Sequence, residues 1–501
     1  MSVDTAAKSV PEPALPEFKT TLGHPRPLWM LFMTEFWERF AFYGIRWALT
    51  LYIVAQFYDG SGEGQAPASR IYGAYLALVY AAAIFGGYVA DRIIGYQRSI
   101  LLGAVVMSAG LFMIAFPDEH VFKFGLATVI AGNGLFKPNI STMVGKLYSQ
   151  GDERRDSGFT LFYMGINLGA MIAPLLTGWM AEHMFGGTPQ IPTYKIVFIT
   201  SGVGMLVSLV WFWFGRRQLG DIGRPPAGDG GGLKMLYVLA FCLVSAPVYY
   251  ALLTIDAAKL QIVLTALFIA LCAMLLAEGI RDGKVARDRA IAMLIIFTFN
   301  ILFWCFFEQA GSSFNFLAEQ IVNRDFGGWI FPVGWFQSVN SLAIITLAPL
   351  VAWTWVRMGR YNPSIPRKFG LGIIFNGLAF LLLMAALSGM VVAGKIPFWT
   401  LFMVYVIQSV GELCLSPIGL SMTTKLAPVR LVGFGMGGWF LSTGIGNNLS
   451  GIFASHASGE SGMTTASALA SYTQGFWILM VGGVALFLIA PLIQKLMHGV
   501  K

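Results

Sequence analysis

Seven ionisable side chains stand inside otherwise apolar stretches of the 501-residue sequence, where a charge is costly to hold. On membrane-insertion scales, one such group at the bilayer centre costs about 2.5–3.5 kcal/mol. These groups therefore need partners, water or a function. Four acids and three bases leave one formal negative charge, which a single proton could neutralise. The seven residues are Glu35, Glu38, Arg39, Arg46, Lys137, Glu308 and Glu412.

The first apolar stretch holds four of the seven charges on one helical face. Successive members of the set are one, three or four residues apart, at positions 35, 38, 39, 42 and 46. A pair of Glu35 with Arg39 could serve only to orient helix packing. That interpretation leaves Glu38 and Arg46 unexplained, so we interpret the face as functional.

The other three charges stand in different apolar stretches. Lys137 lies in a glycine-rich segment that allows close helix approach, although a lysine can also extend to the membrane interface. Trp304 precedes Glu308 by one helical turn, and Glu412 precedes Ser416 by the same spacing. Either glutamate could instead be protonated and hydrogen-bonded for packing.

Composition indicates a membrane protein. Hydrophobic residues make up 56% of the chain and charged residues 12%, about half the charged share of ordinary soluble domains. Apolar blocks of about 20 residues are long enough to cross a bilayer as helices, which satisfy their own backbone in lipid. We predict fourteen spans, at residues 28–57, 70–90, 98–117, 121–146, 157–181, 194–215, 233–253, 260–280, 289–318, 329–356, 367–391, 397–424, 431–454 and 474–497.

Six spans, two spans and six spans follow one another along the chain. This layout is similar to the major facilitator fold, with twelve core helices and an inserted two-helix hairpin. We expect the hairpin, which carries no charge in mid-span, to be a passive spacer. The predicted divisions are an N-terminal tail (1–27), an N-terminal bundle (28–217), a linker with the hairpin (218–285), a C-terminal bundle (286–497) and a short tail (498–501).

The basic residues predict the orientation in the membrane. With the N-terminus in the cytoplasm, 24 of the 33 Lys and Arg residues fall on cytoplasmic segments, as the positive-inside rule requires. Both tails are then cytoplasmic. Basic residues separate the apolar blocks without forming one patch, so nucleic acid is not an expected partner. The first 27 residues lack the pattern of a cleaved signal peptide.

Six motifs in this order resemble signatures of the proton-dependent oligopeptide transporter family, over about residues 28–497. One departure is Phe42-Tyr43, where many members carry two tyrosines, so the side-chain preference of the pocket is in question. The motifs are Glu35-x-x-Glu38-Arg39-Phe40, Lys137-Pro138-Asn139, Phe162-Tyr163-x-x-x-Asn167, Phe303-Trp304-x-x-Phe307-Glu308-Gln309, Gly411-Glu412-x-x-x-Ser416-Pro417 and Gly437-Gly438-Trp439-Phe440.

The resemblance implies an inner-membrane bacterial symporter of di- and tripeptides, acting as a monomer with protons as coupling ion and no cofactor or metal. Arg46 and Lys137 are then expected to receive the peptide carboxylate, and Glu412 the ammonium. The implied pairs Arg46–Glu308 and Lys137–Glu412 would act as outer and inner gates. The expected proton-coupling residues are Glu35, Glu38, Arg39 and Glu308. Further substrate contacts are expected from Tyr43, Tyr80, Tyr163, Asn167, Trp304, Asn340, Ser416 and Trp439.

Other functions stay open at this point. Symport of nitrate or another anion or zwitterion is one alternative, although charges of both signs favour a substrate with both signs. A membrane-embedded enzyme is a second, but the five histidines form no His-Glu-x-x-His motif and no Gly-x-Ser-x-Gly elbow is evident. A sensor without transport is a third.

Overall fold

The computed structural model describes residues 18–149, 152–225 and 232–500, and this part of the chain is almost entirely helical. A two-stranded sheet of β1 (Thr20–Thr21) and β2 (His24–Pro25) precedes the first helix. The helices of the N-terminal half are α1 (Arg26–Arg46), α2 (Ala48–Phe57), α3 (Gln65–Val89), α4 (Tyr96–Ile114), α5 (Glu119–Gly145), α6 (Arg154–His183) and α7 (Tyr194–Gly215), with short turns η1 (Gly62–Gly64), η2 (Ala90–Ile94) and η3 (Arg216–Leu219).

The hairpin and the C-terminal half are also built from helices joined by short turns and loops. The hairpin is α8 (Gly232–Thr254) and α9 (Ala257–Arg281). The remaining helices are α10 (Lys284–Phe307), α11 (Ser313–Gln320), α12 (Trp335–Met358), α13 (Ile365–Gly389), α14 (Phe398–Leu426), α15 (Val432–Ser458) and α16 (Thr465–Leu496), with turns η4 (Glu308–Gly311), η5 (Gly359–Tyr361) and η6 (Val429–Leu431).

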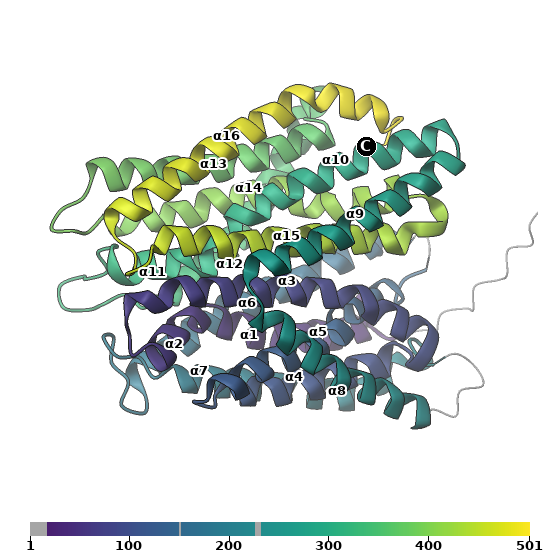
Figure 1. Ribbon diagram of the computed structural model, residues 1–501. Helices are drawn as coiled ribbons and strands as arrows, with labels where there is room; N and C mark the ends of the chain where they lie inside the picture. Colours follow the sequence, from purple (N-terminus) through teal and green to yellow (C-terminus); the bar gives the residue numbers. More distant parts are fainter. Residues whose placement is uncertain (1–17, 150–151, 226–231, 501) are drawn as a thin grey trace, which may run out of the picture.

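The long helices run side by side in two stacked halves (Figure 1). In that view α1–α7 form the lower half and α10–α16 the upper half, and α8 and α9 cross the front. We call the end that carries the 58–64 and 321–334 loops the distal end. The opposite end, where the chain finishes, is the proximal end (Figure 1).

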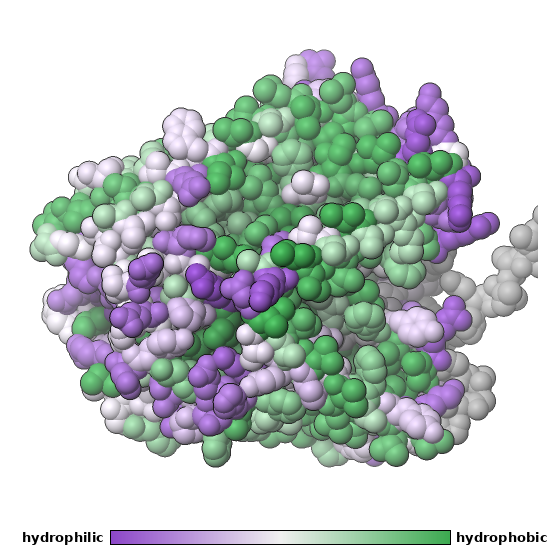
Figure 2. Space-filling model, viewed as in Figure 1, coloured by the Kyte–Doolittle hydropathy of each residue, from purple (hydrophilic) through white to green (hydrophobic). Residues whose placement is uncertain are grey.

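The helices are those of a membrane protein, as predicted. In the described residues, eleven helical segments are long and apolar enough to span a bilayer, or twelve with the bent pair α1–α2. The long helices α5 and α15 are not among them, and both are rich in glycine and polar residues. Figure 2 shows hydrophobic side chains over much of the visible face, with hydrophilic ones mainly toward its two ends and a smaller hydrophilic group near its centre. The predicted all-α membrane fold is confirmed.

Two of the predicted spans, 28–57 and 289–318, are interrupted near the functional charges. Helices α1 and α2 meet at Trp47 with a bend of 42°. Helix α10 ends at Phe307, and the turn η4 separates it from α11. The hydropathy of the sequence cannot predict such breaks, because the backbone groups that a break leaves free are hydrogen-bonded by side chains from elsewhere in the fold. For example, Asn315 donates to the carbonyl of Trp47 at 2.9 Å.

Two predicted span starts were wrong. Helix α16 begins at Thr465 rather than 474, because a capping box of Thr464 with Ser467 starts it in a polar segment. Helix α12 begins at Trp335 rather than 329. The preceding residues form a loop, in which Arg324 donates to the carbonyl of Phe331 at 2.6 Å.

The two halves contact each other along small residues. Helices α3 and α15 approach so closely that a Cβ on Gly73 would lie 2.7 Å from the Cα of Gly451. Toward the distal end, the Trp335 indole donates to the carbonyl of Leu175 at 2.9 Å, joining α12 to α6. The halves are therefore held together at their distal end by direct backbone and side-chain contacts.

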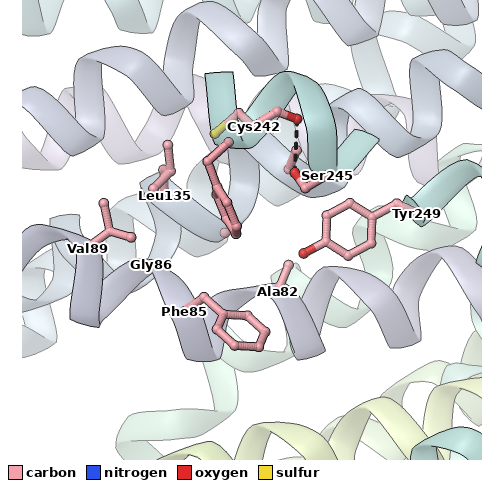
Figure 3. A pocket seen from close by; sticks show the side chains of 11 residues that line it. Ala82, Phe85, Gly86, Val89, Leu135, Cys242, Ser245 and Tyr249 are labelled. Carbon is pink, nitrogen blue, oxygen red and sulfur yellow. Dashed lines mark hydrogen bonds between the residues drawn. The ribbon is translucent and has the colours of Figure 1, made fainter. Parts of the chain in front are cut away.

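The hairpin packs against both halves. Helix α8 packs on α3 and α5, and the Tyr250 hydroxyl lies 2.7 Å from Nδ1 of His120. Helix α9 packs on α10 and α15, and Asn448 donates to Gln261 at 2.9 Å. Beneath α8 is a small cavity of about 20 Å³ with mostly apolar walls, among them Phe85 of α3 (Figure 3).

Candidate functional site

Arg46 and Glu308 form the distal part of the site and join the two halves. Nη2 of Arg46, at the end of α1, lies 2.6 Å from Oε2 of Glu308, the first residue of η4. Both side chains are less than a tenth exposed, and Nε of Arg46 also donates to the Tyr72 hydroxyl at 2.9 Å. A buried ion pair loses much stability when one partner is removed or neutralised, because the other charge is left unpaired. This pair can therefore act as a two-state contact.

A second buried cluster lies two to three turns earlier on α1. Arg39 pairs with Glu35 at 3.2 Å and with both carboxylate oxygens of Glu38, with Nη2 to Oε1 at 2.7 Å. The Arg39 guanidinium also stands 5.0 Å over the Phe42 ring. One buried oxygen of Glu35 has no hydrogen-bond partner among the described residues. The cluster therefore has an unsatisfied carboxylate oxygen at which a proton could be bound.

Lys137 and Glu412 belong to opposite halves and are both partly exposed. The Lys137 ammonium stands 4.3 Å over the Tyr80 ring, a cation–π contact. Oε2 of Glu412 accepts a hydrogen bond from Asn340 at 3.0 Å. Among the ion pairs of the described residues, none joins Lys137 to Glu412. In this conformation the distal pair Arg46–Glu308 is formed, and Lys137 and Glu412 are each available to another group.

A small cavity lies beside Arg46, between the two halves. It has a volume of about 10 Å³, room for about one water molecule, and both halves line it. Arg46 contributes from α1, Asn340 from α12, and Tyr405 and Gln408 from α14. The Arg46 guanidinium and polar side chains of the C-terminal half thus line a small space between the halves.

The other predicted contact residues divide into two groups. Tyr43, Tyr80, Tyr163 and Trp304 are partly exposed, as side chains that line an open site must be, whereas the Ser416 hydroxyl is buried. Asn167 instead donates to its own helix, at the carbonyl of Tyr163. Trp439 is only 6% exposed and packs edge-on against Phe297, inside the C-terminal half. In this conformation Asn167 and Trp439 therefore contribute mainly to helix packing.

The sequence did not reveal several polar residues that hold the site in place. Tyr72 bonds Arg46, and Asn300 accepts from the Trp304 indole at 3.0 Å. Gln309 donates to the Ser450 hydroxyl at 3.0 Å, which ties η4 to α15. The spacing of four between Asn300 and Trp304 was a usable signal, because such pairs share a helical face. The partners of Tyr72 and Gln309 lie far away in the chain and left no such signal.

Two helical halves around a central polar site, with buried charges of both signs, define a membrane transporter. Within the described residues, no group of three or more His, Cys, Asp or Glu side chains could hold a metal ion.

Comparisons with known proteins identify the family. The sequence profile of the POT family matches residues 97–467. The chain is 36% identical to the peptide transporter YePEPT of Yersinia enterocolitica subsp. palearctica, over 89% of this chain and 90% of that one. It is 35% identical to a di-/tripeptide transporter of Lactococcus lactis subsp. cremoris, over 85% and 88%. The crystal structure of the peptide transporter POT in complex with sulfate has a TM-score of 0.81 at 34% identity, covering 96% of this chain and 97% of that one.

The chain belongs to the POT family. It is accordingly a multi-pass membrane transporter and not an enzyme.

Proposed function

We propose that the protein is a proton-coupled symporter that imports di- and tripeptides by alternating access. The observation that carries the proposal is the placement of opposite charges on opposite halves. Arg46 and Lys137 come from the N-terminal half, and Glu412 from the C-terminal half. A short peptide carries an ammonium at one end and a carboxylate at the other, whatever its side chains. A site with fixed charges of both signs can therefore accept many sequences.

In the proposed complex the peptide carboxylate binds Arg46 and Lys137, and its ammonium binds Glu412. Asn340 supports this role because it donates to Glu412 and so orients the carboxylate. The exposed aromatic rings of Tyr43 and Tyr163 would form adaptable walls for the side chains. A plain anion such as nitrate would leave Glu412 without a counter-charge, so we favour a zwitterion.

Proton coupling in this proposal depends on the buried carboxylates. A proton on Glu308 and a peptide carboxylate at Arg46 both compete with the pair that closes the distal end. Glu35 and Glu38, which are both paired with Arg39, would transfer protons along α1. Opening is then a population shift that favours whichever state binds proton and peptide better.

The proposed setting is the inner membrane of a bacterium, with the proximal end and both termini in the cytoplasm. Six basic residues lie on segments that would then face outward, against 24 on segments that would face inward. The distal pair then closes the outer gate, and Lys137 with Glu412 would close the inner one. We propose that a single chain suffices, with no cofactor, and that the two halves rock about the central site.

Uptake by purified protein in liposomes tests the proposal directly. We expect labelled dialanine to accumulate under an inward proton gradient, with competition by unlabelled tripeptides but not by free amino acids or nitrate. Collapse of the gradient with an ionophore should reduce uptake to equilibration. Competition by nitrate with no effect of tripeptides would replace the peptide proposal with an anion transporter.

A further inference from the structure

Tyr72 of α3 lies at the distal contact between the halves and has no role in the scheme above. Its hydroxyl accepts a hydrogen bond from Nε of Arg46 at 2.9 Å, and the side chain is only 2% exposed. The same guanidinium uses Nη2 for Glu308. Arg46 is therefore held from two sides, by Tyr72 of its own half and by Glu308 of the other.

Gly311, the last residue of η4, provides the space that Tyr72 occupies. A Cβ added at Gly311 would overlap the Tyr72 hydroxyl and the adjoining ring carbon. Its φ is not in the left-handed region, so the requirement for glycine is one of space and not of backbone conformation. The Gly311 carbonyl accepts from Thr50 and from Asn315, both at 3.1 Å. Since partners from both halves fix this backbone, it cannot easily move away from an added methyl group.

We propose that Tyr72 is a positioning residue of the distal gate and that its ring fits the socket at Gly311 when the gate closes. The hydroxyl directs the Arg46 guanidinium toward Glu308. When the pair with Glu308 breaks, Tyr72 keeps Arg46 on the N-terminal half, and the ring leaves the socket as the halves separate. This inference rests on the proposed transport cycle, because Tyr72 and Gly311 are assigned as two parts of its distal gate.

Substitution at the socket tests the steric half of the proposal. Gly311→Ala should shift the protein toward a state open at the distal end. In a Tyr72→Ala background, which already lacks the hydroxyl bond to Arg46, the added Gly311→Ala change should open the distal end no further, because the clash is gone. Gly389→Ala is the matched control, since a Cβ there meets nothing within 4 Å. The state is read as the distance between nitroxide labels at exposed positions 195 and 460, with the four native cysteines replaced and neither peptide nor gradient present.

Removal of the hydroxyl tests the positioning half and covers the case in which Gly311→Ala does not fold. Tyr72→Phe keeps the ring but leaves Arg46 with one partner fewer. Because hydrogen bonds to charged groups change an equilibrium by roughly ten- to a hundredfold, the open population should rise at least about tenfold. Tyr75→Phe is the control, because Tyr75 is buried on the same helix and its hydroxyl bonds to no other residue in the described part of the chain.

The outcomes separate this inference from the proposed function. Unchanged label distances in a folded Gly311→Ala protein would overturn the socket, as would a further opening caused by Gly311→Ala in the Tyr72→Ala background. If Tyr72→Phe and Tyr75→Phe change the open population equally, Tyr72 contributes only to core packing and does not position Arg46. The label distances are measured without substrate, so they test the socket independently of whether dialanine is transported.

Discussion

Replacement of Glu412 by glutamine removes the charge proposed to bind the peptide ammonium while keeping the shape of the side chain. In the structure Asn340 donates to Oε2 of Glu412 at 3.0 Å, and a glutamine oxygen can accept the same bond. Helix α14 should therefore keep its contacts. What is lost is a hydrogen bond between two charged groups, worth about 1.5–3 kcal/mol. That loss corresponds to a roughly 10- to 150-fold weaker affinity for dialanine.

Calorimetric titration of the protein in lipid nanodiscs measures the effect, with N-acetyl-dialanine as a second ligand. The acetylated peptide has no ammonium, so its weak binding should be the same for wild type and for Glu412→Gln. Glu460→Gln, at an exposed distal position, is the matched control and should bind dialanine like wild type. Thermal unfolding of the unliganded proteins checks that folding is unaffected.

Two results would refute the reasoning about Glu412. Unchanged dialanine affinity would mean that the ammonium binds elsewhere. An equal loss of affinity for the acetylated peptide would mean that the substitution disturbs the site in general rather than removing one charge contact.

Three further predictions concern other groups. Glu308→Gln should retain exchange of labelled for unlabelled peptide in liposomes but lose pH-driven accumulation, and persistent accumulation would assign coupling to another carboxylate. Tyr250→Phe removes the bond to His120 and should speed amide exchange near residue 250 roughly 2- to 12-fold while leaving uptake intact; unchanged exchange would show that the bond does not form. Hydrogen bonds from Arg154 lower the pKa of Asp152 to about 2, so its contribution to stability is complete above the unfolded pKa of about 3.9 and is lost as pH falls toward 2. The difference in melting temperature between wild type and Asp152→Asn should therefore be equal at pH 5 and pH 8, and a difference that changes between them would contradict this assignment.

The sequence was most informative at charged residues in apolar segments, because the burial of a charge costs free energy and therefore indicates a partner or a function. The charges of α1 could be predicted to share one face because their spacing follows the helical repeat, and the structure has Arg39 bonded to both Glu35 and Glu38. The break at η4 could not be predicted, because it depends on tertiary bonds such as that of Gln309 to Ser450, 141 positions away. A hydropathy profile reports only that the flanking residues are apolar, and this does not distinguish a broken helix from a continuous one.

Tyr72 and Trp439 show the same limit for aromatic residues. A tyrosine in an apolar helix can pack, anchor at the interface or bond a charge, and only the position of Arg46 decides that Tyr72 does the last. Trp439 stands in a motif typical of the family, yet its ring is enclosed by Phe297 and Phe369 in this conformation. Motifs therefore predicted which residues gather between the halves better than which of them face the open space.

The energetics of the distal pair suggest why proton and peptide must act together. A two-state gate needs a differential binding energy of about 5.5 kcal/mol to pass from 1:99 to 99:1. One hydrogen bond to a charged group supplies about 1.5–3 kcal/mol. A proton on Glu308 alone, or a peptide carboxylate at Arg46 alone, therefore moves the gate only part of the way, whereas the two together approach the full shift. In the proposed cycle, the competition of proton and peptide for the Arg46–Glu308 pair would therefore favour symport over transport of either one alone.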